Sequence, residues 1–265
     1  MAEILTRVDR FGDWYAKRED LAGYTGDGAP SGAKVRQYVG MIANSDPSAT
    51  LMVGCSADSA MQVYVSHAAA THGRTGIVVV PKRKARSDAT EYAIAMGAEV
   101  VEVSPGYPSV YRARCREIAA ERNLKIVRWD REYAARDTAA QVANIPEDVT
   151  RVIVPTGSGL TAAGVMGGLS AIGRNDVVVV AACVSDMANG ESIAQTCEKF
   201  FGQCSVNLVV VPPASAYGKG VKGAVLPNGD GLDPFYAAKA MGHVTPGSML
   251  WVSGRRPGVR IVTGP

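Results

Sequence analysis

The sequence has few of the features that would cross-link a protein through disulfides, anchor it in a membrane or give it a large net charge. Its 265 residues include only five cysteines, an odd number without a C-x-x-C pair, so neither a disulfide framework nor a zinc site is indicated. No apolar run is long enough to span a membrane, and the opening segment mixes acids, bases and aromatics, unlike a leader peptide. These absences predict an unprocessed cytoplasmic protein with reduced thiols and no membrane segment.

Neither sign of charge dominates the chain. Lysine and arginine number 28 against 25 aspartates and glutamates, which gives weak support for a nucleic-acid partner. A basic cluster, Lys82, Arg83, Lys84 and Arg86, is typical of a solvated loop, although it also suits the phosphates of a nucleic acid. The three histidines are too scattered to indicate a metal site.

Short apolar runs rich in valine and isoleucine alternate with helical patterns along the chain. The runs lie at 49–55, 75–81, 98–103, 125–130, 150–156, 177–184 and 206–213. Most of the helix-like stretches between them end at or near a glycine or an asparagine. This succession predicts an α/β fold in which parallel, twisted sheets are flanked by helices on both faces.

A polar stretch at 131–150 carries the chain from a first group of predicted strands to a second. We therefore expect two lobes. The smaller α/β lobe spans 46–140, and the larger α/β lobe is formed by 1–45 plus 141–265.

The loop PTGSGLTAAG at 155–164 follows a predicted strand and opens a predicted helix. Its backbone N–H groups can converge on one point in front of a helix dipole, which is the arrangement of a phosphate cradle. The same letters also satisfy the dinucleotide fingerprint through Gly157, Gly159 and Ala162, with an acid at Asp186. A tight turn without a ligand is the third interpretation, and the loop alone does not decide among them.

Small and turn-forming residues precede Lys34 in GDGAPSGAKVRQY, and a helical pattern begins at this lysine. Glycines at a helix start allow the backbone to approach a bound group closely. An isolated lysine together with a phosphate loop is what a pyridoxal phosphate enzyme needs, and the nearby cation Arg36 would favour a neutral amine. Without the loop, a solvated lysine at a helix start would be the simpler interpretation.

Several motifs together resemble one enzyme family. WYAKREDLAGYTGDGAPSGAKVRQY is similar to a segment in which K-R-E-D-L precedes G-N-K-x-R, GLDPFYAAKAM at 231–241 is similar to L-D-P-V-Y-x-G-K-A-M, and the 155–164 loop is similar to T-G-S-G-G-T. These are motifs of the 1-aminocyclopropane-1-carboxylate deaminase and D-cysteine desulfhydrase family. That family belongs to the tryptophan-synthase-β-like, or fold type II, pyridoxal phosphate enzymes. The resemblance implies a two-lobed fold type II architecture.

The resemblance also implies the residues that hold pyridoxal 5′-phosphate. Lys34 would form the Schiff base and later move a proton at the substrate α-carbon, and Ser253, in LWVSGRRP, would hydrogen-bond the pyridine nitrogen. The implied phosphate ligands are Gly157, Ser158, Gly159, Leu160 and Thr161.

The residues that face the substrate follow the family less closely. Ser59, Tyr217 and Tyr236 fall where relatives place catalytic side chains. However, Ala60 stands where the family has an asparagine that supports the phenolic oxygen of the cofactor, and Met61 replaces the next polar residue. The reaction therefore need not be that of the family's best-known members.

The implied activity is that of a lyase or deaminase that acts on an amino acid by elimination, deamination or decarboxylation, and relatives are commonly homodimers. The sequence leaves three alternatives open. The same cofactor could modify an amino acid attached to a larger carrier, such as a modified base in DNA. The 157–164 loop could serve an NAD-dependent oxidoreductase. Finally, the protein could bind the cofactor without catalysing a reaction.

Overall fold

The computed structural model describes residues 5–184, 188–213, 215 and 219–261. The chain divides into two compact units, of which one comprises residues 1–33 and 131–265 and the other residues 34–130. Helix α1 (Ala33–Ala43) therefore lies almost entirely in the smaller unit, whereas the sequence analysis assigned this segment to the larger lobe.

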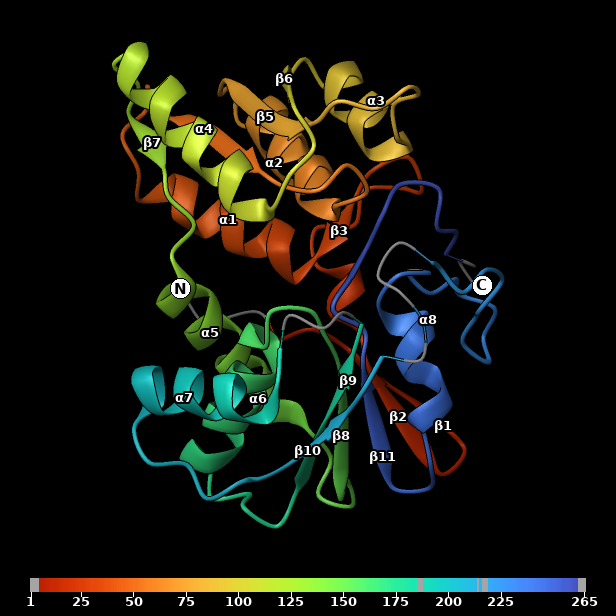
Figure 1. Cartoon of the computed structure of the whole chain (residues 1–265). Helices are drawn as coiled ribbons and strands as arrows, with labels where there is room; N and C mark the ends of the chain where they lie inside the picture. Colours follow the sequence, from red (N-terminus) through yellow and green to blue (C-terminus); the bar gives the residue numbers. More distant parts are fainter. Residues whose placement is uncertain (1–4, 185–187, 214, 216–218, 262–265) are drawn as a thin grey trace. The chain divides into compact units, whose positions relative to one another are not determined.

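A six-stranded sheet organises the larger unit (Figure 1). Its strands, in spatial order, are β1 (Val8–Phe11), β2 (Trp14–Lys17), β11 (Ser248–Trp251), β8 (Arg151–Thr156), β9 (Val178–Cys183) and β10 (Asn207–Val211). Only β1 and β2 pair antiparallel; every other neighbouring pair is parallel. A separate antiparallel pair joins β3 (Ser31–Gly32) to β12 (Gly254–Arg255).

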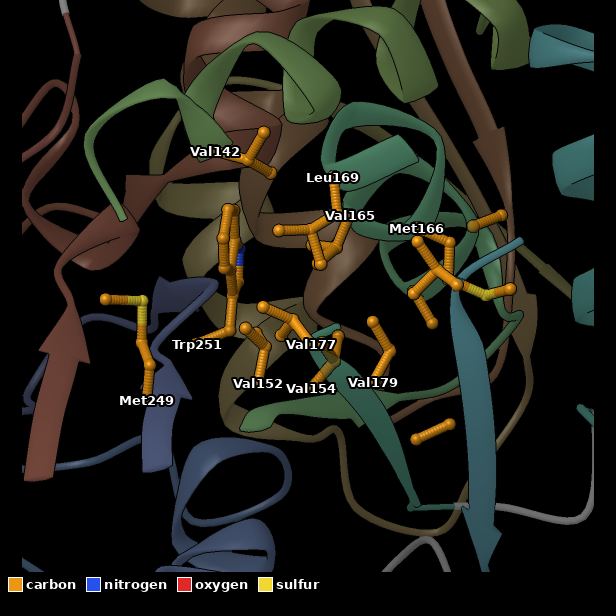
Figure 2. Close-up of a cluster of buried hydrophobic side chains, with 14 of the residues drawn as sticks. Val142, Val152, Val154, Val165, Met166, Leu169, Val177, Val179, Met249 and Trp251 are labelled. Carbon is orange, nitrogen blue, oxygen red and sulfur yellow. The ribbon is translucent and has the colours of Figure 1, made fainter. Parts of the chain in front are cut away.

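Helices cover both faces of this sheet. On one face lie α6 (Leu160–Ala171) and α7 (Gly190–Phe201), with α5 (Arg131–Ala140) packed against α6, and on the other lies the short α8 (Ala237–Ala240). Alternation along β8 explains the two cores, because Val152 and Val154 pack with α6 whereas Ile153 packs with the alanines of α8. Figure 2 shows the first core, where Trp251 lies among valines and Leu169. The 3₁₀ turns of this unit are Glu19–Leu21, Gln141–Asn144 and Met241–His243.

Helix α6 approaches its neighbours at glycines. A Cβ atom on Gly164 would lie 2.8 Å from the carbonyl oxygen of Ala135, and one on Gly168 would lie 2.4 Å from that of Ala139, both in α5. A Cβ atom on Gly167 would meet the ring of Phe201, at the end of α7, at 2.3 Å. The backbone of α6 is therefore in direct contact with both neighbouring helices.

The smaller unit is a four-stranded parallel sheet. Its strands, in spatial order, are β6 (Glu99–Val103), β5 (Gly76–Pro81), β4 (Thr50–Gly54) and β7 (Ile126–Val127), and its further helices are α2 (Ala60–Thr71), α3 (Asp88–Ala95) and α4 (Pro108–Glu121). Val78 and Val80 of β5 pack against Ala93 of α3, whereas Ile77 packs on the opposite face against Ile118 of α4.

The predicted α/β class, with parallel sheets flanked by helices, is confirmed. Each apolar run of the sequence contains a strand, although the 125–130 run contains only the two residues of β7. Strands β1 and β2 were not predicted, because the letters VDRF and WYAK mix charged with apolar residues. In the part of the chain that the structure describes, no helix combines the length and apolar character needed to cross a membrane.

The charged K-R-E-D segment that follows β2 is buried rather than solvated. The guanidinium of Arg18, which is 0% exposed, forms ion pairs with Asp20 at 2.9 Å, Asp230 at 2.7 Å and Asp9 at 2.8 Å. Lys17 donates to the carbonyl oxygen of Thr6 and to the side chain of Asn144. Buried charges are tolerated only when they are paired in this way, so the motif ties distant segments of the larger unit together.

We predict that Leu169→Ala lowers the free energy of unfolding by about 2–5 kcal/mol, because it leaves a cavity beneath α6. Ile172→Ala, at the end of the same helix and 49% exposed, should change it by less than about 0.5 kcal/mol. Urea denaturation followed by far-ultraviolet circular dichroism measures both effects. Equal losses in the two variants would contradict this packing.

Candidate active site

Lys34 lies in the first turn of α1, where its side chain is half-buried. The Nζ atom lies 5.0 Å from the centre of the Trp129 ring. Among the described residues, Lys34 makes no hydrogen bond and no ion pair. Burial lowers the pKa of the Lys34 amine from 10.5 to about 8, because no carboxylate compensates the lost hydration. A sizeable fraction of this lysine is therefore a neutral nucleophile near physiological pH.

The start of α1 is fixed by a close backbone contact within the larger unit. Gly32 has a φ of +124°, and a Cβ atom there would lie 2.4 Å from the Cα atom of Gly254 and 2.8 Å from the carbonyl oxygen of Ser253. The amide of Ala33 donates to that same carbonyl oxygen at 3.0 Å. Only glycine permits this approach, so the sequence G-A-K sets where the helix, and with it Lys34, begins.

The loop between β4 and α2 carries Ser59, which is the N-cap of α2 and accepts a hydrogen bond from the amide of Met61 at 3.3 Å. Ala60 and Gln62 are buried behind it, and Gln62 donates to the carbonyl oxygen of Ala57 at 2.6 Å. Gln62 therefore has a structural role. Its side chain does not take the place of the asparagine side chain that the family carries at the position of Ala60. Burial raises the pKa of the nearby Cys55 thiol to about 12, which leaves it a poor nucleophile.

The 157–161 loop connects β8 to α6, as the sequence predicts for a strand-to-helix turn. Gly159 is the N-cap, adopts a left-handed φ of 83° and offers no side-chain cap. Within the described part of the chain, the amides of residues 157–161 donate no hydrogen bond to a protein group. These amides head a 12-residue helix, so they form a potential site for an anion.

Tyr236 lies beside this loop. A Cβ atom on Gly157 would be 3.3 Å from the Tyr236 hydroxyl oxygen, so the absence of a side chain lets the phenol approach the loop. The D-P-F-Y turn holds the tyrosine in place: the Asp233 carboxylate accepts from the amides of Phe235 at 2.9 Å and Tyr236 at 3.1 Å. The same carboxylate pairs with Arg256 at 3.2 Å. Thus the larger unit brings Tyr236 to the predicted phosphate loop.

Ser253 follows β11 and is half-buried, with its backbone carbonyl engaged at the start of α1. Two residues named in the sequence analysis, Tyr217 and Asp186, lie outside the described residues. In the basic cluster, Arg83 pairs with Asp58 at 2.9 Å and Arg86 pairs with Glu102 at 3.1 Å. Half of that cluster is therefore already neutralised within the smaller unit.

Two residues near this chemistry were not found from the sequence. Trp129 contacts Lys34 across many intervening residues, and nothing in the run KIVRWD indicates this contact. Arg255 is 1% exposed and donates to Ser31, Asp27 and the carbonyl oxygen of Val259, so it secures the loop before Lys34. The letters S-G-R-R-P gave only a weak signal for such a role.

Comparison with protein families gives a match over residues 5–203 to the model described as "Pyridoxal-phosphate dependent enzyme". The chain belongs to this family. The resemblance seen in the sequence motifs is thereby confirmed at the level of fold type II enzymes, and so is dependence on pyridoxal phosphate as the family's cofactor. A sequence comparison with curated proteins gives no match.

Solved structures share the fold. A homologue of ACC deaminase has a TM-score of 0.69 at 19% identity, with 92% of this chain and 85% of that chain covered. A threonine deaminase isoform from Solanum lycopersicum has a TM-score of 0.64 at 14% identity, covering 94% and 76%. A hydrogen sulfide-producing enzyme from Fusobacterium nucleatum has a TM-score of 0.66 at 11% identity, covering 97% and 95%. At such identities the likeness defines the fold alone.

The residues of this chain fit the family's cofactor. Among the described residues, the 157–161 amides have no hydrogen-bond acceptor, which suits them to a phosphate, and the missing Cβ atoms leave room for the Tyr236 phenol at Gly157 and for Ile193 at Gly159. Lys34 supplies an amine with a lowered pKa. The asparagine that the family carries is replaced by Ala60 in this chain.

We predict that amine-directed labelling of Lys34 in the cofactor-free chain has a midpoint near pH 8, because only the neutral amine reacts. Labelling rises with pH, since the neutral fraction increases through the lowered pKa. Peptide mapping across a pH series measures it, with the exposed Lys125 as the internal reference. A midpoint for Lys34 near 10.5, the ordinary value, would show that the amine is hydrated.

We also predict that Gly32→Ala destabilises the larger unit by at least about 1–3 kcal/mol, since it forces an unfavourable backbone conformation against Gly254. Gly28→Ala is the matched control, because nothing lies within 4 Å of a Cβ atom there. Thermal unfolding and binding of pyridoxal phosphate should both suffer in the first variant and not in the second. If Gly32→Ala changed neither thermal unfolding nor cofactor binding, the close contact would be disproved.

Proposed function

We propose that this protein is a pyridoxal phosphate-dependent lyase or deaminase that acts on an amino acid, with Lys34 as the residue that carries the cofactor as a Schiff base. The observation that carries the proposal is the state of Lys34, a half-buried lysine that, among the described residues, lies against an aromatic ring without an acid as partner, and whose pKa is about 8. A lysine kept for structure would be paired or hydrated. A lysine kept for imine chemistry must be neutral part of the time.

Bound pyridoxal phosphate supplies an electrophilic aldehyde and a ring that stabilises negative charge at the substrate α-carbon. The amides of Gly157, Ser158, Gly159, Leu160 and Thr161 would hold its phosphate. The Ser253 hydroxyl would hydrogen-bond the ring nitrogen. A hydroxyl at this position would leave that nitrogen unprotonated, which would moderate the electron-withdrawing power of the ring.

Lys34 would have a second task when substrate is bound. Its free ε-amine can accept the proton from the substrate α-carbon and return it elsewhere, and a pKa of about 8 suits both directions. Tyr236, held beside Gly157 by the Asp233 turn, and Tyr217 are candidates for donating a proton to a departing group. Ser59, at the N-terminus of α2, would bind the substrate carboxylate, since a helix start favours negative charge.

Ala60 separates this protein from the typical family pattern. An alanine offers no hydrogen bond to the phenolic oxygen of the cofactor, so cofactor retention depends more strongly on the phosphate loop and Lys34. The choice among elimination, deamination and decarboxylation depends on which α-carbon bond the substrate-facing residues align with the ring. Because this loop departs from the family, we propose the reaction class without naming one substrate.

A carrier-linked substrate, such as an amino acid on a modified base in DNA, remains the second hypothesis. The pairing of Arg83 with Asp58 and of Arg86 with Glu102 reduces the charge available for phosphate backbones, so it does not favour this hypothesis. The family match supports pyridoxal phosphate over a nicotinamide as the ligand of the 157–164 loop.

The decisive experiment treats the purified holoprotein with borohydride and maps the labelled peptide. We predict that the label is on Lys34, and that Lys34→Ala removes both the label and the yellow absorbance. Lys34→Arg, which keeps the charge but cannot form the imine, should behave like Lys34→Ala. If the label is on another lysine, the assignment is wrong.

A spectral titration then identifies the substrate class. Free amino acids that enter the site should shift the absorbance of the holoprotein and release a keto acid, ammonia or carbon dioxide. Response to conjugates alone would favour the carrier-linked hypothesis, and nucleic-acid binding would then weaken steeply with salt. A yellow protein that responds to neither class would indicate cofactor binding without catalysis.

A further inference from the structure

Trp129 occupies an unusual position in the smaller unit, because it contacts two side chains of the same helix. Lys34 and Tyr38 are four residues apart on α1 and therefore share a face. The Lys34 Nζ atom lies 5.0 Å from the Trp129 ring centre, and the Tyr38 ring lies 4.9 Å from it at an interplanar angle of 56°. Trp129 follows β7 closely, so a strand end presents the indole to this helix face.

The indole is held in place rather than free to turn. Tyr38 is only 3% exposed and packs obliquely against it, which is a favourable geometry for two aromatic rings. Lys34 has no carboxylate or hydrogen-bond partner among the described residues that would orient its ammonium instead. The orientation of the charged lysine in the smaller unit therefore depends on the ring.

We propose that Trp129 is a positioning residue that holds the protonated form of Lys34 over its ring and releases the neutral form. This inference rests on the function proposed above for Lys34. The face of an indole attracts an ammonium but not a neutral amine, because the attraction arises from the ring quadrupole acting on a charge. Trp129 therefore binds the lysine after it has taken up a proton and lets it go when the proton has left.

This selectivity has a use in the proposed reaction. A lysine that alternates between covalent attachment and proton transfer must leave its attachment point and return to it. A contact with the charged state alone holds the protonated lysine without a carboxylate that would keep it protonated permanently. A carboxylate in the same position would keep Lys34 charged, which would oppose imine formation.

The test compares Trp129→Phe and Trp129→Leu with the parent chain after removal of the cofactor. Nuclear magnetic resonance of isotope-labelled lysine side chains follows the titration of Lys34, and Lys34→Ala assigns the signal. We predict that the pKa of Lys34 falls in Trp129→Leu, since leucine still excludes water but has no π face. Trp129→Phe, whose ring is a weaker acceptor of a cation, should give an intermediate value.

The rate of imine formation with added pyridoxal 5′-phosphate provides a second readout. At neutral pH it should rise about two- to fivefold in Trp129→Leu, the factor by which loss of a typical cation–π contact increases the neutral fraction. Turnover of an amino acid should fall in the same variant, because the protonated lysine is no longer held. Tyr38→Phe, which keeps the packing ring, is the matched control and should leave both readouts unchanged.

Circular dichroism monitors folding, and Trp129→Phe carries the test if Trp129→Leu does not fold. An unchanged or raised pKa of Lys34 in folded variants would overturn the proposal, since Trp129 would then act only by excluding water. The titration is read without the cofactor, so it is independent of the reaction. If borohydride labels another lysine while Trp129 still affects the titration of Lys34, the proposed function fails and the positioning role in catalysis fails with it, but the contact itself stands.

Discussion

The contact between Gly32 and the Ser253–Gly254 backbone is the constraint on which the candidate site depends. It joins a two-residue strand near the N-terminus to the C-terminal part of the chain and ends in the hydrogen bond from Ala33 to Ser253. The next residue is Lys34. The start of α1 is thus set by backbone geometry within the larger unit, which is less variable than a side-chain contact.

Buried charge reinforces this constraint from two sides. Arg18, with its three aspartates, ties β2 to the 230 region, and Arg255 ties the 26–31 loop to the C-terminal segment. Such groups are costly to desolvate and stabilise only when every partner is present, so they specify one arrangement of the chain more than they add free energy. The family's K-R-E-D letters act in this way in the protein described here. They are near the site in sequence, but their described contacts are structural.

The sequence predicted what local chemistry determines. Val- and Ile-rich runs gave the parallel strands, the glycines of 157–159 gave the turn into α6, and the small residues before Lys34 gave the start of α1. It did not predict β1 and β2, because charged residues interrupt their apolar letters, and one of them, Lys17, is charged and buried at the same time. It also did not predict Trp129 beside Lys34, since a contact between residues far apart in the chain leaves no local pattern. Ala60 was recognised as a departure from the sequence alone, and the structure adds that its neighbour Gln62 is engaged elsewhere.

The glycines of α6 affect how the N-terminus of this helix would bind an anion. Gly164 and Gly168 bring α6 against the backbone of α5, and Gly167 brings it against the ring of Phe201. The helix therefore has little room to shift along its axis or to rotate about it. The backbone N–H groups at the start of α6 are consequently held in one orientation before any ligand binds. Recognition at such a turn requires little rearrangement, and the entropy that a mobile loop would lose on capture has already been lost during folding.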